Sequence, residues 1–159
     1  MEKKIIITGG LGYIGTELCK LYSGVSWNNQ IIIIDNRFIS ERVNQIRNWN
    51  MEFVHGDILD KELINKYCKD ADIIHHLAGI TDVPRTKTES SETKDEKIKL
   101  VAEKGMQNIL DAISNKCKII FPSTHVVYEG IEKVENNISE EVDLKPLLSY
   151  SSSKAVNEK

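Results

Sequence analysis

Short apolar runs alternate with stretches of helical periodicity along this chain. Each run has the length of a β-strand, and the five runs cover Lys4–Thr8, Gln30–Asp35, Met51–His55, Ala71–Leu77 and Lys118–Pro122. The four consecutive isoleucines of the second run predict a strand buried on both faces. Strands that alternate with helices predict a parallel sheet covered on both sides, a doubly wound α/β fold of the Rossmann type.

The stretches between these runs place apolar residues three or four positions apart, as amphipathic helices do. After the first strand, Ile14, Leu18, Leu21 and Val25 fall on one helical face. Further helices are expected over residues 38–49, behind Asp60 as an N-cap, along a stripe from 98 to 112, and from residue 149 onwards. Arg85–Lys97 contains no apolar residue and predicts a solvated loop that leads into a helix.

Composition and charge narrow the class of protein. The chain has 159 residues, 40% hydrophobic and 28% charged, which suits one domain with a real core. Its net charge of −3 argues against nucleic acid as a partner, because phosphate binding needs clustered basic residues. No apolar run approaches the ~20 residues of a membrane span, and the first residues enter a strand rather than a signal peptide.

The cysteines and histidines show no spacing typical of metal ligands. Cys19, Cys68 and Cys117 lie far apart, which predicts free thiols in a reducing cytoplasm. His75 and His76 are adjacent, so on a strand they would point to opposite faces. We therefore expect no metal site.

A glycine-rich turn joins the first strand to the first helix. It reads Thr8-Gly9-Gly10-Leu11-Gly12-Tyr13-Ile14-Gly15. Gly9 permits the tight turn, Gly12 lets the backbone approach a pyrophosphate, and Gly15 lets the helix lie near the sheet. The helix N-terminus offers unpaired N–H groups and a positive dipole end to phosphates. Taken alone, the turn is weak evidence, because ordinary strand-to-helix turns are also rich in glycine.

An acidic residue at the end of the second strand strengthens the case for a dinucleotide. Asp35 follows Gly15 by twenty residues, the spacing at which a carboxylate reaches both hydroxyls of the adenosine ribose. A 2′-phosphate would meet a like charge there, so Asp35 favours NAD over NADP. Arg37 counts against this preference, because its guanidinium could hold a 2′-phosphate if Asp35 turned away.

Two candidate catalytic side chains lie near the end of the chain. Tyr150 and Lys154 are four residues apart in a segment expected to be helical, which places them on one face. A nearby ammonium should lower the pKa of the tyrosine, so that Tyr150 can take a proton from a substrate hydroxyl. Ser123 and Thr124 follow the fifth strand, where hydroxyls either contact the ligand or only cap the strand end.

Together these segments resemble one family, the extended short-chain dehydrogenase/reductases, and within it the NAD-dependent epimerase/dehydratase group that acts on nucleotide sugars. The resemblance follows the family's order of motifs over nearly the whole chain. Its segments are residues 8–15, Asp35-Asn36, Gly56-Asp57-Ile58, His76-Leu77-Ala78-Gly79, Ser123-Thr124-His125-Val126-Val127-Tyr128 and Tyr150-Ser151-Ser152-Ser153-Lys154.

The resemblance implies a role for each matching position. Tyr150 would be the catalytic base, Lys154 would also hold the nicotinamide ribose, and Thr124 would hydrogen-bond the sugar hydroxyl. The positions implied to bind the cofactor are Gly9, Gly12, Tyr13, Ile14, Gly15, Asp35, Asn36, Asp57, Ile58, Leu77, Ala78, Gly79, Ser123, Tyr150 and Lys154. Of these, Asp57 and Ile58 would contact the adenine. The family also implies a homodimer formed through the helices at 98–113 and 149–159.

Three departures from the family pattern matter. His125 and Val126 stand where 4,6-dehydratases carry Asp-Glu, which favours 4-epimerase or simple oxidoreductase chemistry. Ala102 stands where many members carry an asparagine that helps organise the site. The chain also stops five residues after Lys154, whereas members run to about twice this length. We therefore expect residues 1–159 to be an NAD-binding domain without its substrate-binding part.

Three functions remain open from the sequence. The first is an NAD-dependent nucleotide-sugar epimerase, or the cofactor-binding portion of one. The second is an NAD(P)-dependent reductase or dehydrogenase on a substrate other than a sugar. The third is a dinucleotide-binding module without catalysis, although such a module has no need to keep Thr124, Tyr150 and Lys154 together.

Overall fold

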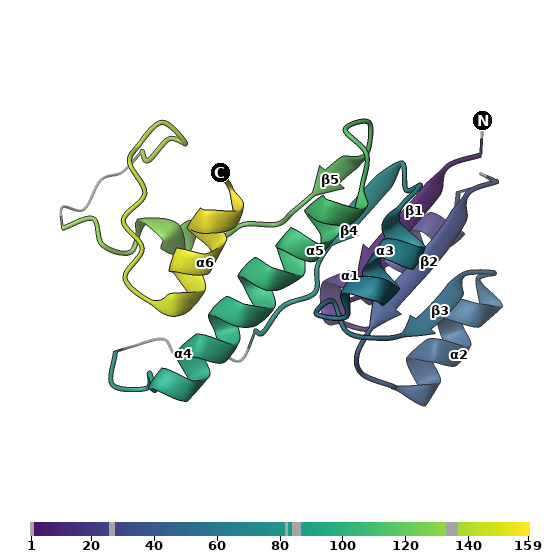
Figure 1. Cartoon of the computed structure of the whole chain (residues 1–159), viewed down its shortest axis with the longest axis horizontal. Coiled ribbons are helices and arrows are strands. Elements are labelled where there is room, and N and C mark those ends of the chain that lie inside the picture. The colour runs from purple at the N-terminus through teal and green to yellow at the C-terminus, as the bar shows by residue number, and fades with distance from the viewer. Residues whose placement is uncertain (1, 26–27, 82, 84–86, 133–136) are drawn as a thin grey trace. The chain divides into compact units, whose positions relative to one another are not determined.

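The computed structural model describes residues 2–25, 28–81, 83, 87–132 and 137–159. These residues form two compact units. The first comprises residues 1–79 and 105–122, and the second comprises residues 80–104 and 123–159. Figure 1 labels the helices and strands of both units.

A five-stranded parallel sheet forms the centre of the first unit (Figure 1). Its strands are β1 (Lys4–Thr8), β2 (Gln30–Asp35), β3 (Glu52–His55), β4 (Ile73–His76) and β5 (Lys118–Ile120), in the spatial order β3-β2-β1-β4-β5. β1 pairs with β2 on one side and with β4 on the other, so the strand order reverses beside β1. In open α/β sheets, ligands bind at this point, outside the carboxyl ends of the strands.

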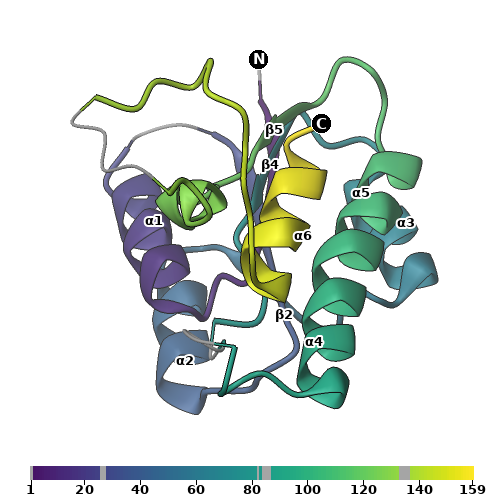
Figure 2. The same cartoon turned by 90° about the vertical axis from the view of Figure 1, so that its left-hand side faces the viewer.

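Helices cover both faces of this sheet, which confirms the predicted fold class (Figure 2). The helices α1 (Tyr13–Ser23) and α2 (Ser40–Asn48) lie on one face, and α3 (Lys61–Cys68) and α5 (Gly105–Ala112) lie on the other. Alternate residues of the strands point to opposite faces, so both faces of β1 and β2 are apolar. The strand residues Ile31 to Asp35 are buried without exception, as the run of isoleucines predicts.

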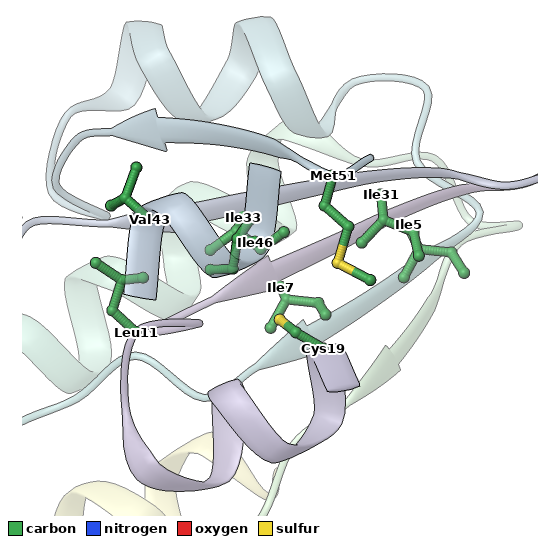
Figure 3. Close-up of a cluster of buried hydrophobic side chains, with 9 residues drawn as sticks. All are labelled: Ile5, Ile7, Leu11, Cys19, Ile31, Ile33, Val43, Ile46 and Met51. Atoms are coloured by element: carbon green, nitrogen blue, oxygen red, sulfur yellow. The ribbon is translucent and has the colours of Figure 1, made fainter. Parts of the chain in front are cut away.

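A cluster of buried hydrophobic side chains joins α1 and α2 to the sheet (Figure 3). β1 and β2 contribute four isoleucines, α1 contributes a cysteine, α2 contributes two branched residues, and Leu11 and Met51 complete the cluster. Its members are Ile5, Ile7, Leu11, Cys19, Ile31, Ile33, Val43, Ile46 and Met51. Burying this apolar surface is the main driving force that holds these helices on the sheet.

The predicted apolar face of the first helix was wrong. Ile14 and Leu21 are 63% and 69% exposed, and α1 buries Gly15 and Cys19 instead. Small residues on the buried side let α1 approach the sheet closely, and a larger side chain at either position would push it away. Cys19, Cys68 and Cys117 are free cysteines, and the first two are buried. Burial raises the pKa of each of these two to about 12.

The capping prediction for the third helix is confirmed. The Asp60 carboxylate accepts a hydrogen bond of 3.0 Å from the backbone N–H of Leu63 at the start of α3.

The two adjacent histidines do point to opposite faces. His75 Nε2 lies 2.7 Å from the hydroxyl of Tyr22 on α1, and His76 Nδ1 lies 2.8 Å from the hydroxyl of Thr8. The strands predicted over residues 51–55, 71–77 and 118–122 are all shorter in the structure, and β5 has only three residues.

The second unit is mainly helical. It contains α4 (Glu92–Lys99), the π-helical segment η1 (Leu100–Lys104), the 3₁₀ turn η2 (His125–Tyr128) and α6 (Ser149–Asn157). The segments α4, η1 and η2 all pack against α6. α4 begins six residues before Ile98, because the Ser91 hydroxyl accepts a hydrogen bond from Lys94 N–H and caps a helix where the sequence predicts a loop. Arg85 and Thr86 of that predicted loop lie outside the described residues.

None of the helices that the structure describes combines the length and the apolar character needed to cross a membrane. In the same part of the chain, no three His, Cys, Asp or Glu side chains come together in a way that could hold a metal ion.

Candidate functional site

The glycine-rich turn lies between the C-terminal end of β1 and the N-terminus of α1. Gly9 adopts a φ of +72°, a left-handed conformation that favours glycine, and a Cβ there would lie 2.6 Å from the backbone nitrogen of Ala78. A Cβ on Gly15 would lie 2.5 Å from the carbonyl oxygen of Gly9. The turn therefore needs glycine at both positions for steric reasons, as the sequence predicts.

The N-terminus of α1 is open to a ligand. Its N-cap is Gly12, which has no side chain to satisfy the first N–H groups of the helix. These N–H groups lie at the positive end of the helix dipole, so the turn is a cradle of backbone donors of the kind that favours an anionic group. Tyr13 and Ile14, in the first turn, are 83% and 63% exposed beside this cradle.

Asp35 braces the turn from the end of β2. Its side chain is 3% exposed, and its Oδ2 accepts a hydrogen bond of 2.9 Å from the N–H of Leu11. Its Oδ1 accepts hydrogen bonds from the backbone N–H of Arg37 at 3.0 Å and from Arg37 Nε at 3.2 Å. Asp35 thus lies against the glycine turn.

The loop after β3 brings the predicted adenine-binding residues together with Asn36. The Asn36 amide donates a hydrogen bond of 2.9 Å to Asp57 Oδ2, and Asp57 Oδ1 accepts one of 2.9 Å from Leu59 N–H. Ile58 is 5% exposed, and a Cβ on Gly105 would lie 2.4 Å from its Cδ1. The side chain of Ile58 therefore packs under α5 and is not exposed to a ligand.

Asn108 supports this loop and was missed from the sequence. It is 1% exposed on α5, and its amide nitrogen donates a hydrogen bond of 2.9 Å to the carbonyl of Ile58. Within the described part of the chain, the amide oxygen of Asn108, Oδ1, is buried without a hydrogen-bond partner. The available signal was an asparagine between Gly105 and Ile109 inside an apolar helical stripe, where a polar residue needs a reason to be buried.

The segment after β4 lies against the glycine turn. Leu77 N–H donates to the carbonyl of Thr8 at 3.1 Å, and Ala78 N–H donates to the Thr8 hydroxyl at 3.3 Å. Gly79 follows in open space. The structure thus brings the turn, Asp35 and residues 77–79 together at the C-terminal ends of β1, β2 and β4.

The candidate catalytic side chains belong to the second unit. Tyr150 and Lys154 lie on one face of α6, and Lys154 Nζ is 5.8 Å from the centre of the Tyr150 ring. This is a contact with the face of the ring, in which the cation is attracted to the π electrons. The predicted four-residue spacing on a helix is confirmed.

The sequence predicts that Lys154 lowers the pKa of Tyr150, and the structure gives the opposite direction. Burial raises the pKa of Tyr150 above its ordinary value. Burial also lowers the pKa of Lys154, an effect that the nearby carboxylate of Glu158 opposes. Desolvation disfavours both charged forms and outweighs the attraction on which the prediction from spacing relied. A basic Tyr150 therefore needs further positive charge nearby.

Ser123 and Thr124 hold structural hydrogen bonds. The Ser123 hydroxyl donates to the carboxylate of Glu158, the residue that follows α6. The Thr124 hydroxyl caps η2 by accepting a hydrogen bond of 3.4 Å from Val126 N–H. The hydrogen of the Thr124 hydroxyl is not used in that bond, so the side chain can still donate to a substrate oxygen.

The N-terminus of α6 is capped by a residue distant in sequence. Glu129 Oε1 accepts hydrogen bonds from the N–H groups of Leu147 at 2.7 Å and Leu148 at 2.8 Å, and from the Ser151 hydroxyl. Burial raises the pKa of Glu129, but these three hydrogen bonds outweigh it, and the pKa is lowered overall. The carboxylate stabilises the start of the helix that carries Tyr150.

Replacing Glu129 with glutamine should lower the free energy of unfolding by about 1–3 kcal/mol, because charge-assisted hydrogen bonds become neutral. Folding lowers the pKa of Glu129. Its contribution to stability is therefore fully present above its ordinary pKa of about 4.3, and it is lost as the pH falls through the lower pKa of the folded state. Urea unfolding at several pH values measures this. Glu141→Gln removes an exposed charge from the same unit as a control. Equal stability of the two variants at neutral pH would contradict the assignment.

Ala102, where the family asparagine is absent, lies in the π-helical segment η1. Its carbonyl accepts a hydrogen bond of 3.1 Å from the amide of Asn157 on α6. Single π-helical turns recur at functional sites, because they leave the regular hydrogen-bond ladder of the α-helix. A side chain of α6 thus binds the main chain of η1 at Ala102.

Comparisons with known proteins agree with this geometry. The chain is 33% identical to CDP-paratose 2-epimerase of Salmonella typhi over 149 residues, which is 86% of this chain and 41% of that protein. It superposes on the UDP-N-acetylglucosamine 4-epimerase of Methanobrevibacter ruminantium M1 with a TM-score of 0.79 and 26% identity, over 99% of this chain and 48% of the other. The UDP-glucose 4-epimerase of Brucella ovis, solved in complex with NAD, gives 0.77 and 27% over 98% and 46%.

The chain therefore spans less than half the length of each of these relatives. The family comparison covers nearly all of it. The model of the 3-beta hydroxysteroid dehydrogenase/isomerase family matches residues 6–159. With its Rossmann-type sheet and glycine turn, the chain belongs to this family of enzymes, within the extended short-chain dehydrogenase/reductases.

Proposed function

We propose that this chain binds NAD and serves an NAD-dependent epimerase that acts on a nucleotide sugar. The observation that carries the proposal is the uncapped N-terminus of α1 beneath the glycine turn, with Asp35 braced beside it. The relatives named above support the substrate class, since all three are epimerases of nucleotide sugars.

The first unit supplies the binding groups. The N–H groups at the start of α1 hold the pyrophosphate, and Asp35 accepts hydrogen bonds from the adenosine ribose. Asp57 and the main chain of Ile58 bind the adenine, and residues 77–79 line the central part of the cofactor. When bound, NAD would take a hydride from a sugar carbon and return it to the other face of that carbon.

The second unit supplies the proton chemistry. Tyr150 accepts the proton of the sugar hydroxyl, and the Lys154 ammonium stabilises the phenolate that assists this transfer. The hydroxyl of Thr124 donates a hydrogen bond to the same substrate oxygen. Because burial alone raises the pKa of Tyr150, this role requires nearby positive charge, that of Lys154 included, to favour the phenolate.

We propose a homodimer as the assembly, formed through the helices at residues 98–113 and 149–159. Leu100, Leu110 and Val156 on these helices are 54%, 48% and 53% exposed, which leaves apolar surface for a partner. Ile98 and Ile109, from the predicted stripe, are buried within their own units and are not part of that surface.

Native mass spectrometry of the purified chain with added NAD tests the cofactor proposal. We expect one NAD per chain and recovery of oxidised NAD after denaturation, because an epimerase regenerates its cofactor in each cycle. A chain that takes up no NAD would overturn the proposal. Variants of the catalytic side chains then distinguish an enzyme from a module that only binds the cofactor.

The family match favours a second candidate, an NAD(P)-dependent dehydrogenase on a substrate other than a sugar. The same Tyr150 and Lys154 serve that reaction. It predicts net formation of reduced cofactor that leaves the protein, whereas the epimerase keeps its cofactor oxidised over the full cycle. Measuring free NADH after many turnovers distinguishes the two.

A further inference from the structure

The buried side of α6 consists of small side chains. The residues that this helix buries are Ser151, Ser153 and Ala155, and the Ser153 hydroxyl donates within the helix, to the carbonyl of Ser149 at 2.8 Å. Small side chains interlock weakly with their neighbours, because they offer little volume to fix a helix about its own axis. The rotation of α6 about its axis therefore depends on hydrogen bonds that its side chains make to other segments.

Such a hydrogen bond is present near each end of α6. Near the start, the Ser151 hydroxyl donates to the carboxylate of Glu129, the residue that follows η2. Asn157 is the last residue of α6, and its amide nitrogen donates to the carbonyl of Ala102 in η1 at 3.1 Å. The two bonds join α6 to two different segments of its unit, so the second bond fixes the end of the helix that the first leaves free.

The π-helical segment η1 is suited to accept this bond. In a π-helical turn the main-chain hydrogen bonds run from residue i to i+5, and a side chain from outside can bind where the regular ladder is interrupted. Ala102 lies in the middle of η1 (Leu100–Lys104). Its side chain is a single methyl group, which leaves room for the amide of Asn157 to reach the main chain.

Asn157 shares its helical face with the candidate catalytic side chains. Tyr150, Lys154 and Asn157 follow one another by four and three residues, which is the spacing of a single stripe along an α-helix. All three are half-buried, so the stripe lies at the border of the packed side of α6. The bond from Asn157 to η1 therefore fixes the direction in which this stripe points.

We propose that Asn157 is a positioning residue for Tyr150 and Lys154. It acts through the helix: its bond to Ala102 sets the rotation of α6, and this rotation sets where the Tyr150 hydroxyl and the Lys154 ammonium lie. Lys154 is one helical turn from Asn157 and is affected most. This inference rests on the proposed function, because it takes Tyr150 as the proton acceptor and Lys154 as the cation that stabilises the phenolate.

Asn157→Leu tests the inference, because leucine has a similar volume and no hydrogen-bond donor. The measurement is the single-turnover reduction of bound NAD by UDP-, CDP- and dTDP-sugars over a range of sugar concentrations. We expect the maximal rate to fall about 10- to 100-fold, since misplacing a reacting group by about 1 Å costs up to about 10²-fold. The sugar concentration at half-maximal rate and the affinity for NAD should each change less than about threefold.

Two further variants separate positioning from stability. Asn157→Gln keeps an amide donor and should react at least about fivefold faster than Asn157→Leu. Asn137→Leu makes the same change at an exposed asparagine of the same unit and should keep the wild-type rate within about threefold. A residue that only stabilised the fold would lower the free energy of unfolding when replaced, without slowing hydride transfer in the folded protein with NAD bound.

The outcomes distinguish this inference from the proposed function. If Tyr150→Phe loses hydride transfer while Asn157→Leu keeps the wild-type maximal rate within about threefold, the inference fails and the proposed function stands. The inference also fails if Asn157→Gln is as slow as Asn157→Leu, or if Asn157→Leu loses NAD binding, because the change would then extend beyond α6. If the wild type reduces no bound NAD with any of these sugars, both fail.

Discussion

Tyr150→Phe is expected to slow hydride transfer by about 10²–10⁴-fold while NAD binding is unchanged, because the variant lacks the group that accepts the substrate proton. Single-turnover reduction of bound NAD by UDP-, CDP- and dTDP-sugars measures the rate even where steady-state turnover is slow. Since burial raises the pKa of Tyr150, the phenolate is the minor form at neutral pH, and the wild-type rate should increase with pH. The variant should lose that increase.

The control for this experiment lies in the same unit. Tyr128 donates its hydroxyl to the carbonyl of Ser139 at 3.5 Å, and we assign it no role in the reaction. Tyr128→Phe should retain the wild-type rate within about threefold. If Tyr150→Phe were as active as Tyr128→Phe, Tyr150 would not be the base, and a binding module without catalysis would become the better interpretation.

Gly9→Ala should lower the free energy of unfolding by about 2–4 kcal/mol, the combined effect of a left-handed φ and of overpacking. The added Cβ would lie 2.6 Å from the nitrogen of Ala78, which is a main-chain atom and cannot rotate away as a side chain does. Relief would require β1 and the segment after β4 to separate, with loss of the hydrogen bonds that join Thr8 to Leu77 and Ala78. Urea unfolding followed by far-UV circular dichroism measures the change.

Gly24→Ala provides the matched control. This glycine follows α1 with a φ of −83°, and a Cβ there would meet its nearest neighbour at 3.6 Å, an ordinary contact. We expect a change of less than about 0.5 kcal/mol. A Gly9→Ala variant as stable as Gly24→Ala would show that the turn can relax, and the requirement for glycine at position 9 would be wrong.

The parts of the fold that the sequence predicts well depend on local patterns. Three features are each determined by residues close together in the sequence. They are the isoleucine runs of β1 and β2, the spacing of Gly9, Gly12 and Gly15, and the Asp60 cap. The errors have a common origin in contacts between distant segments. The buried face of α1 is set by how close that helix comes to the sheet, and periodicity alone favoured Ile14 and Leu21 over Gly15 and Cys19.

The candidate site shows the same division. Its residue types, the cradle of N–H groups and the shared face of Tyr150 and Lys154 follow from the sequence. The charge states do not, because the pKa of Tyr150 depends on burial as well as on its neighbour four residues away. Asn108 and Glu129 were missed because each is bound to a segment eighteen or more residues away.

By itself, the sequence determined the class of fold, the position of the glycine-rich turn and the family, since these depend on residue type at fixed spacing. Only the tertiary structure decided that Arg37 occupies the acceptor sites of Asp35, that Glu129 caps α6, and that the Ile58 side chain is buried under α5. Hydrogen-bond acceptors and buried space are limited, so which neighbour takes them is settled by the packed chain rather than by residue type.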